Sequence, residues 1–171
     1  RADNSLRGML CEFGVVLPQG LYQLRARLPQ VLLDEQERLA ALGREIWDGT
    51  DGKVTAFVQG IGTASSLLGV ASALKQRNGD VRVVGLEPAG SAAITGGSTG
   101  SFAMQGWAGM VPPLWDPELV DDVWTIEDGE ALEMAVRLAQ EEGILAGTSS
   151  GANVVGALRL AAELPPGSVI V

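Results

Sequence analysis

Short runs of β-branched and apolar residues alternate with segments of helical periodicity, and this alternation limits the fold more than any other feature of the chain. The apolar runs cover residues 15–16, 54–58, 81–86, 123–126, 144–146 and 168–171. Runs of this length are typical of strands, and helical patterns lie between several of them. The sequence therefore predicts an α/β fold, a three-layer arrangement of an open, mostly parallel sheet with helices on both faces.

Three helices are predicted between these runs: residues 65–77, residues 129–142, and a third that follows Gly151 and ends before Pro165. Glycine or proline after each helix supplies its stop signal, with Gly143 following the second. Helical spacing predicts the inward-facing residues Leu67, Leu68, Ala71 and Leu74 in the first helix, Leu132, Ala135, Leu138 and Ala139 in the second, and Val154, Val155, Leu158 and Ala161 in the third.

Residues 90–113 interrupt the alternation. The segment is rich in Gly and Ser and contains Met104, Trp107 and Met110. A long irregular segment is uncommon inside a compact domain unless it covers or lines a site. We therefore expect it to lie over a ligand rather than to serve only as a connection.

The inventory of reactive side chains excludes several kinds of catalysis. The 171 residues include no histidine, one cysteine (Cys11) and two lysines (Lys53 and Lys75). Ser-His-Asp and Cys-His catalysis, Cys/His zinc sites and a disulfide within the chain are therefore excluded. We predict no metal site, identify no catalytic residue, and expect Cys11 to be a small buried hydrophobic residue.

Charge and hydropathy argue against two classes of partner. Acidic residues outnumber basic ones by 21 to 12, the net charge is -9, and no basic cluster is present that could follow a phosphate backbone. No apolar run approaches the roughly 20 residues of a membrane span. We expect a cytoplasmic chain without nucleic-acid or membrane partners.

The two ends of the sequence indicate a piece of a longer protein. The sequence begins at Arg1 rather than Met and stops at Val171 within an apolar run. Because a buried strand normally continues into a turn, we expect truncation at both ends.

Residues 54–66 are the most informative stretch, since a strand there enters a loop of small residues and then a helix. Free backbone N–H groups at a helix start, with the helix dipole behind them, can bind an anion, and Thr63, Ser65 and Ser66 add hydroxyl donors. The spacing is neither G-x-G-x-x-G nor that of a P-loop, which leaves a smaller phosphate as the candidate ligand. The alternative is a tight turn capped by Thr63 or Ser65.

Residues 144–153 repeat this arrangement, with Thr148, Ser149 and Ser150 at a helix start. The carboxyl ends of parallel strands share one edge of the sheet, where ligands bind, so the two hydroxyl-rich loops can face one pocket. Capping by serine is again the alternative. Together the two loops favour a small phosphorylated ligand.

Several motifs, in family order, resemble the pyridoxal-phosphate enzymes of the cysteine synthase type, the fold type II group that includes cystathionine β-synthase. The resemblance covers the chain from about Arg44 on. The motifs are Glu45-Ile46-Trp47, residues 60–66, Val84-Gly85-Leu86-Glu87-Pro88, Gln105-Gly106, Val111-Pro112 and residues 141–152.

The resemblance implies pyridoxal 5'-phosphate as the cofactor. The family's phosphate-binding loop matches Gly62, Thr63, Ala64, Ser65 and Ser66. Ala64 and Ser65 replace two glycines, and Ser66 replaces a threonine but keeps the hydroxyl. A Cβ atom at Ala64 or Ser65 is expected to strain any position that requires a positive φ.

The resemblance also assigns the far side of the cofactor. Ser149 matches the serine that meets the pyridine nitrogen, and Gly106 falls beside the substrate, with Trp107 next to it in place of an aliphatic residue. A neutral hydroxyl at the ring nitrogen suits β-elimination and β-replacement on serine-like substrates.

The family also needs a lysine that binds the cofactor covalently, and its motif lies upstream of anything present here. Lys53 is predicted at the amino end of a strand, the wrong edge of the sheet, and Lys75 in the last turn of a helix with its side chain in solvent. The resemblance makes residues 1–19 a remnant of the smaller N-terminal domain and residues 20–171 the larger cofactor-binding domain. This chain alone is expected to be inactive.

The parent enzyme implied by the resemblance is a homodimer that makes cysteine from an activated serine of the O-acetylserine type and a sulfur donor. Its substrate is a small-molecule amino acid. Two alternatives stay open: a lyase such as cystathionine β-synthase or a serine or threonine dehydratase, and a non-catalytic binding protein derived from the family. The N-terminal substrate loop would separate the lyase, and a native start codon just upstream of Arg1 would support the binding protein. The most useful observation is the upstream coding sequence, read for a lysine motif.

Overall fold

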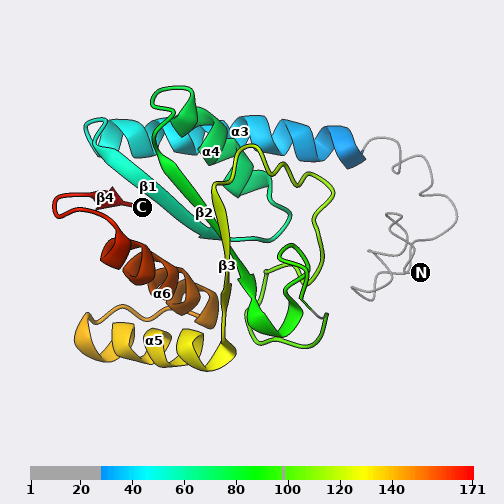
Figure 1. Cartoon of the computed structure of the whole chain (residues 1–171), viewed down its shortest axis with the longest axis vertical. Helices are drawn as coiled ribbons and strands as arrows, with labels where there is room; N and C mark the ends of the chain where they lie inside the picture. The colour runs from blue at the N-terminus through cyan, green and yellow to red at the C-terminus, as the bar shows by residue number, and fades with distance from the viewer. Residues whose placement is uncertain (1–27, 98) are drawn as a thin grey trace, which may run out of the picture.

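The computed structural model describes residues 28–97 and 99–171 (Figure 1). The predicted domain remnant at residues 1–19, with Cys11, lies outside the described residues. In chain order the elements are α3 (Leu28–Gly49), β1 (Val54–Gly60), α4 (Ser65–Lys75), β2 (Arg82–Pro88), the short 3-10 helix η2 (Ala89–Ser91), β3 (Asp122–Ile126), α5 (Asp128–Glu141), α6 (Thr148–Glu163) and β4 (Val169–Ile170).

The described strands form one parallel sheet in the order β3-β2-β1-β4. Val58 of β1 lies opposite Val84 of β2, which in turn lies opposite Asp122 of β3. Helices α3 and α4 cover one face of the sheet, and α5 and α6 lie on the other (Figure 1). This arrangement confirms the predicted three-layer α/β fold.

The core consists of two clusters, one on each face of the sheet. Phe57 of β1 belongs to the cluster beneath α4, whereas its neighbour Val58 belongs to the cluster beneath α6. The inner strands are therefore buried on both faces, which explains their nearly continuous apolar runs. The predicted inward residues of α4 are confirmed as buried: Leu67, Leu68, Ala71 and Leu74.

The sequence did not predict helix α3. It packs closely on α4 at Gly43, which has no side chain. A Cβ atom added there would lie 2.7 Å from the Ala73 Cβ and 2.9 Å from the Val70 carbonyl oxygen. Ile46 and Trp47 of α3 pack against the core cluster beneath α4. The helix thus completes the outer layer on this face.

The strand predicted at residues 144–146 is wrong. Gly143, as predicted, follows α5 and adopts a positive φ of 70°, and the Ile144 N–H donates to the Leu138 carbonyl at 3.0 Å. Beyond this turn Leu145 is 94% exposed, and the segment runs between α5 and α6 without joining the sheet. Its apolar residues have strand propensity, but no described strand lies beside them to complete a ladder.

The predicted apolar faces of α5 and α6 are wrong in part. Leu132 and Leu158 are 55% and 53% exposed, and Ala161 is also exposed. Of the predicted inward residues, Ala135 is confirmed as buried, and Leu138, Ala139, Val154 and Val155 are half-buried. The buried residues that the sequence did not predict are Ala131 in α5 and Gly151, Ala152, Gly156 and Leu160 in α6. The helices approach so closely that small residues define their contact, and helical spacing of apolar residues did not identify all of these positions.

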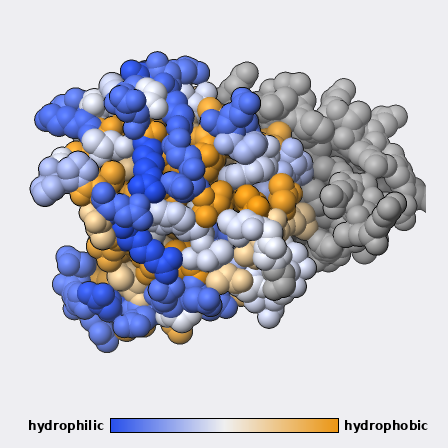
Figure 2. All heavy atoms as spheres, viewed as in Figure 1, coloured by the Kyte–Doolittle hydropathy of each residue, from blue (hydrophilic) through white to orange (hydrophobic). Residues whose placement is uncertain are grey.

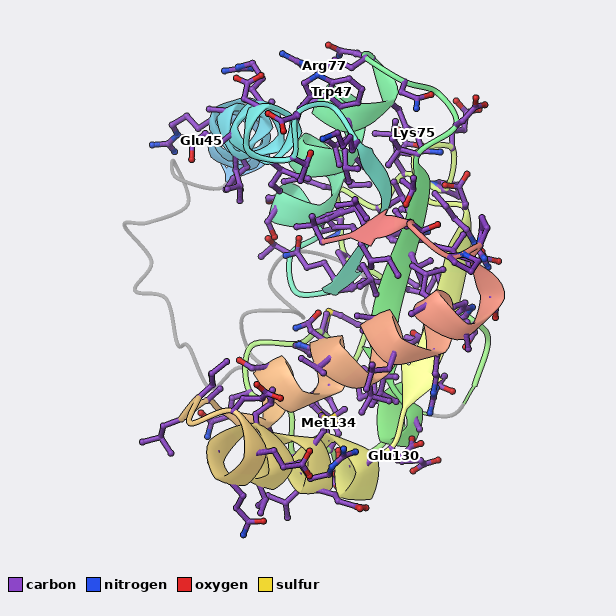
Figure 3. The ribbon with its side chains drawn as sticks, turned by 90° about the vertical axis from the view of Figure 1, so that its left-hand side faces the viewer. Glu45, Trp47, Lys75, Arg77, Glu130 and Met134 are labelled. Carbon is purple, nitrogen blue, oxygen red and sulfur yellow. The ribbon has the colours of Figure 1, made fainter. Side chains whose placement is uncertain are left out.

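A hydrogen-bonded arginine joins α5, α6 and β3. Arg159 donates to both carboxylate oxygens of Glu130, at 2.8 and 2.7 Å, and to the Thr125 carbonyl at 3.0 Å. The hydrogen bond to Arg159 lowers the pKa of Glu130. About one helical turn beyond Glu130, Met134 points from α5 toward α6 (Figure 3). These contacts fix the α5–α6 pair against the edge strand β3.

Apolar side chains also reach the surface. Figure 2 shows hydrophobic residues among the hydrophilic ones on one face of the molecule. Val136, Ile144 and Leu145 are 47%, 53% and 94% exposed. Within the described ranges no helix combines the length and apolar character needed to cross a membrane.

We predict that Gly151→Ala destabilises the fold by about 1–3 kcal/mol, as expected for overpacking. A Cβ atom at residue 151 would lie 2.1 Å from the Ala131 carbonyl oxygen and 2.7 Å from the Ala135 nitrogen. Gly147→Ala is the matched control, because nothing lies within 4 Å of a Cβ atom there. Urea denaturation gives both free energies of unfolding, and equal values for the two variants would contradict the tight α5–α6 contact.

Candidate functional site

The site lies at the carboxyl end of β1, where the strand order changes direction. From β1 the chain crosses through α4 to β2, whereas α5 and α6 lead from β3 back to β4 on the other side of β1. Ligands of open α/β sheets bind at such a switch point, outside the strand carboxyl ends. The loop found there is residues 60–66, here called the 60–66 loop.

Ala64 sets the shape of the 60–66 loop. It is the residue before α4 and adopts a left-handed conformation, with φ 67° and ψ -8°. The expected strain is therefore present at Ala64, whereas Ser65 lies in the helix without a positive φ. A left-handed L-residue costs roughly 1–2 kcal/mol, and such strain clusters at functional sites.

The backbone of the loop offers unused hydrogen-bond donors. Within the described part of the chain, the N–H groups of Gly62, Thr63, Ala64 and Ser66 have no protein acceptor. They lie at the N-terminus of α4, where the helix dipole favours negative charge. A left-handed residue directly before right-handed helical ones also turns successive N–H groups toward a common point. The loop thus has the donors that an anion requires.

The hydroxyl groups of the loop are connected to one another. Thr63 Oγ1 donates to Ser65 Oγ at 3.0 Å, and Gln59 Nε2 donates to Ser66 Oγ at 2.6 Å. Because both serine oxygens accept hydrogen bonds, their own protons remain available to a further acceptor. The alternative of a turn capped by Thr63 or Ser65 is borne out in part: the N-cap residue is Ala64 and makes no side-chain capping bond, but Thr63 Oγ1 accepts the Ser65 N–H at 3.4 Å.

A second segment, residues 103–109, crosses over this loop. Ala108 N–H donates to the Ile61 carbonyl at 2.7 Å. A Cβ atom at Gly62 would lie 2.7 Å from the Gly106 carbonyl oxygen, and one at Gly60 would lie 2.1 Å from Trp107 Cε2. The structure therefore brings Gly106 next to the 60–66 loop. The irregular segment predicted at residues 90–113 is confirmed from residue 92 on wherever it is described, whereas residues 90 and 91 belong to η2.

The first turn of α6 forms the third part of the site. Ser149 lies inside this turn, and the N-cap residue is Gly147, which makes no side-chain capping bond. Capping therefore does not explain the serine. Asn153 Nδ2 donates to the Ser149 carbonyl at 2.8 Å, and Asn153 Oδ1 accepts the Gly60 N–H at 2.8 Å. Two hydrogen bonds thus connect the backbone of Ser149 to the carboxyl end of β1.

The roles of Asn153 and Glu87 were not predicted from the sequence. The buried Glu87 carboxylate, 1% exposed, accepts the Ile94 N–H at 2.8 Å and the Thr95 N–H and hydroxyl at 2.9 and 2.5 Å. It fixes the segment that follows η2. Both residues had a detectable signal, since each is a polar residue in an otherwise apolar strand or helix pattern.

The two lysines lie away from this site. Lys53 precedes β1 at the amino edge of the sheet, and its side chain is 70% exposed. The prediction of a solvated Lys75 is wrong, because Lys75 is 18% exposed and its Nζ lies 2.8 Å from Asp121. In Figure 3 Lys75 lies at the opposite end of the molecule from Glu130 and Met134. Its position in the last turn of α4 is confirmed.

The residues present fit the phosphate group of a small cofactor. Unused N–H groups and serine hydroxyls converge at a helix N-terminus, while the first turn of α6 lies across the end of the same strand. This arrangement is that of an α/β domain that binds a small phosphorylated molecule. No group of three or more His, Cys, Asp or Glu residues able to hold a metal ion occurs within residues 28–97 and 99–171.

Comparison with known proteins identifies the class more closely. Residues 36–171 match the family described as pyridoxal-phosphate dependent enzyme. The chain is 38% identical over 131 residues to a cysteine synthase of Staphylococcus aureus, which covers 75% of this chain and 42% of that protein.

Solved structures give the same result. An O-acetyl serine sulfhydrylase (isoform 3) from Entamoeba histolytica superposes with a TM-score of 0.78 at 35% identity, covering 81% of this chain and 42% of that one. A hydrogen sulfide-producing enzyme from Fusobacterium nucleatum gives 0.74 at 31% identity, with coverages of 82% and 43%.

The chain belongs to the family of pyridoxal-phosphate-dependent enzymes, within the cysteine synthase type of fold type II. The predicted cofactor, pyridoxal 5'-phosphate, is confirmed by this membership. The chain spans about two fifths of the length of the curated relatives it matches.

Proposed function

We propose that this chain is the cofactor-binding part of a cysteine synthase-like enzyme, which replaces the β-substituent of an activated serine of the O-acetylserine type with a sulfur nucleophile. The observation that carries the proposal is the joining of the 60–66 loop to the first turn of α6 through Asn153. Similarity to a cysteine synthase and an O-acetyl serine sulfhydrylase supports it.

In this proposal the phosphate is bound by the backbone N–H groups of Gly62, Thr63, Ala64 and Ser66 and by the hydroxyls of Ser65 and Ser66. Gln59 Nε2 donates to Ser66 Oγ, so the Ser66 hydroxyl proton points away from Gln59 and is available to the phosphate. All of these donors are neutral, so the field of α4 supplies the electrostatic attraction. The phosphate end of the cofactor is thereby fixed without a lysine or arginine.

Ser149 and Gly106 have different roles. Ser149 presents a neutral hydroxyl to the pyridine nitrogen, which leaves that nitrogen largely unprotonated. When bound, pyridoxal phosphate supplies an electron sink for the charge that develops on the substrate. Gly106, with its positive φ of 83° and no atom within 4 Å of a Cβ position, leaves room beside the loop for a small-molecule amino acid.

Other features of the parent enzyme belong to the same proposal. These are a smaller N-terminal domain that carries the lysine, residues 20–171 as the larger domain, a homodimer, a cytoplasmic location and an inactive isolated chain. A lyase is the second candidate, favoured by the similarity to a hydrogen sulfide-producing enzyme. A non-catalytic binding protein is the third, and it would bind the cofactor without turnover.

We predict that the chain binds pyridoxal phosphate non-covalently and that Ser66→Ala weakens binding about 10- to 100-fold. The variant loses a hydrogen bond to a charged group, worth roughly 1.5–3 kcal/mol. Ser72→Ala in the same helix is the control, since Ser72 Oγ accepts only from exposed Gln76. Equilibrium dialysis gives the affinities, and borohydride reduction with peptide mapping should find no stoichiometric modification of Lys53 or Lys75. Unchanged binding in Ser66→Ala, or one cofactor per chain fixed to either lysine, would refute the proposed site.

A second prediction concerns the ring end of the cofactor. Ser149→Ala should weaken binding by roughly 0.5–1.5 kcal/mol, whereas Ser149→Asp should favour a protonated pyridine nitrogen. The nitrogen-15 chemical shift of labelled pyridoxal phosphate reports that protonation, with Ser150→Asp as the control in the same turn. In a restored full-length enzyme, Ser149→Asp should lose replacement activity much more than cofactor affinity. Identical chemical shifts with the wild type and Ser149→Asp would contradict the contact between Ser149 and the pyridine nitrogen.

A further inference from the structure

We propose that Asn153 is a positioning residue that sets the separation between the two ends of the cofactor site. One end is the 60–66 loop, and the other is the first turn of α6 with Ser149. The inference rests on the proposed function, because it requires a cofactor that contacts both ends of the site at once. Asn153 would hold the two ends at the separation that this cofactor spans.

The geometry gives Asn153 this role through both halves of one amide. Its Oδ1 accepts the N–H of Gly60, the last residue of β1, and its Nδ2 donates to the Ser149 carbonyl, both at 2.8 Å. Gly60 and Asn153 are 93 positions apart in the chain. A single partly buried side chain therefore connects a strand end to a helix start.

The Gly60 N–H needs an acceptor at this position. Alternate N–H groups of a strand point to the same side, and the preceding one, that of Val58, donates to the Val171 carbonyl at 2.8 Å. The next N–H on that side is that of Gly60, which Asn153 satisfies. The side chain thus continues the row of hydrogen bonds on the β4 side of β1 and ties it to α6.

The position of Gly60 is restricted from the other side by Trp107. A Cβ atom at residue 60 would lie 2.1 Å from the indole, and Trp107 itself is 7% exposed. Gly60 is therefore held between a buried aromatic ring and the Asn153 amide. Because the next residues form the phosphate-binding loop, a shift of Gly60 relative to Ser149 changes the distance that the cofactor must span.

Helix stability does not account for asparagine at this position. Asparagine is a poorer helix former than alanine in a helix interior, and Asn153 lies in the second turn of α6. Its neighbours Ala152 and Gly156 are small and buried. Alanine would therefore suit the local helix better. Asparagine adds one long-range hydrogen bond, from the Gly60 N–H, and one within α6, to the Ser149 carbonyl.

The test compares a ligand that touches one end of the site with one that touches both. Inorganic phosphate occupies only the 60–66 loop, whereas pyridoxal phosphate also reaches Ser149. In Asn153→Ala we expect phosphate affinity within about twofold of wild type and pyridoxal phosphate affinity reduced about tenfold, as for the loss of a typical hydrogen bond. Phosphorus-31 NMR titration measures both ligands on the same 171-residue chain.

Two further variants separate positioning from general stability. Asn153→Asp keeps the acceptor for Gly60 but loses the donor to Ser149, so it should weaken pyridoxal phosphate at least as much as Asn153→Ala. Asn78→Ala is the control, because Asn78 Oδ1 accepts the Asp80 N–H at 3.0 Å in an exposed turn. It should leave both affinities unchanged, and urea denaturation of all variants reports folding.

Three outcomes overturn the inference. Unchanged pyridoxal phosphate affinity in Asn153→Ala would mean that the Asn153 hydrogen bonds do not set the separation between the two ends of the site. Equal losses for both ligands would assign Asn153 to the stability of the 60–66 loop alone. If the wild-type chain binds neither ligand, the proposed function fails, and the inference fails with it.

Discussion

Burial of the inner strands on both faces is the constraint on which the rest of this structure depends. Phe57 and Val58 are adjacent in β1, yet they belong to core clusters on opposite faces of the sheet. A helical layer must therefore cover each face. The crossover through α4 leads from β1 to β2, whereas the crossover through α5 and α6 leads from β3 to β4 on the other side of β1. That reversal places the 60–66 loop and α6 at one strand end, where a ligand can reach both.

The site is assembled by close backbone approaches rather than by charged side chains. Gly60 lies against Trp107, Gly62 lies against the Gly106 carbonyl, and Gly151 lets α6 approach α5. Each contact needs a residue without a Cβ atom. The contacts at Gly60 and Gly62 fix the positions of backbone donors, and the contact at Gly151 fixes the start of α6. Ala64 is the exception, because it holds a left-handed conformation with a side chain present.

The sequence predicted the features that depend on local pattern. The strands β1 to β3, the helix α4 with its buried Leu67 and Leu74, and the turn at Gly143 follow from periodicity and stop signals. Pattern failed where packing decides: Leu132 and Leu158 are exposed because α5 and α6 meet through alanine and glycine. Residues 144–146 failed as a strand because pairing depends on a neighbour that periodicity does not reveal.

For the site, the sequence predicted the 60–66 loop and the turn containing Ser149, because both use small and hydroxylated residues in motifs. It missed Asn153, whose role depends on a partner 93 positions away. In the proposed site, the backbone N–H groups of Gly62, Thr63, Ala64 and Ser66 bind a phosphate. Nitrogen-15 amide NMR of the chain, titrated with inorganic phosphate, tests it most directly. We predict saturable shifts concentrated at residues 62–66, whereas shifts confined to exposed arginines such as Arg137 would contradict the proposed phosphate site.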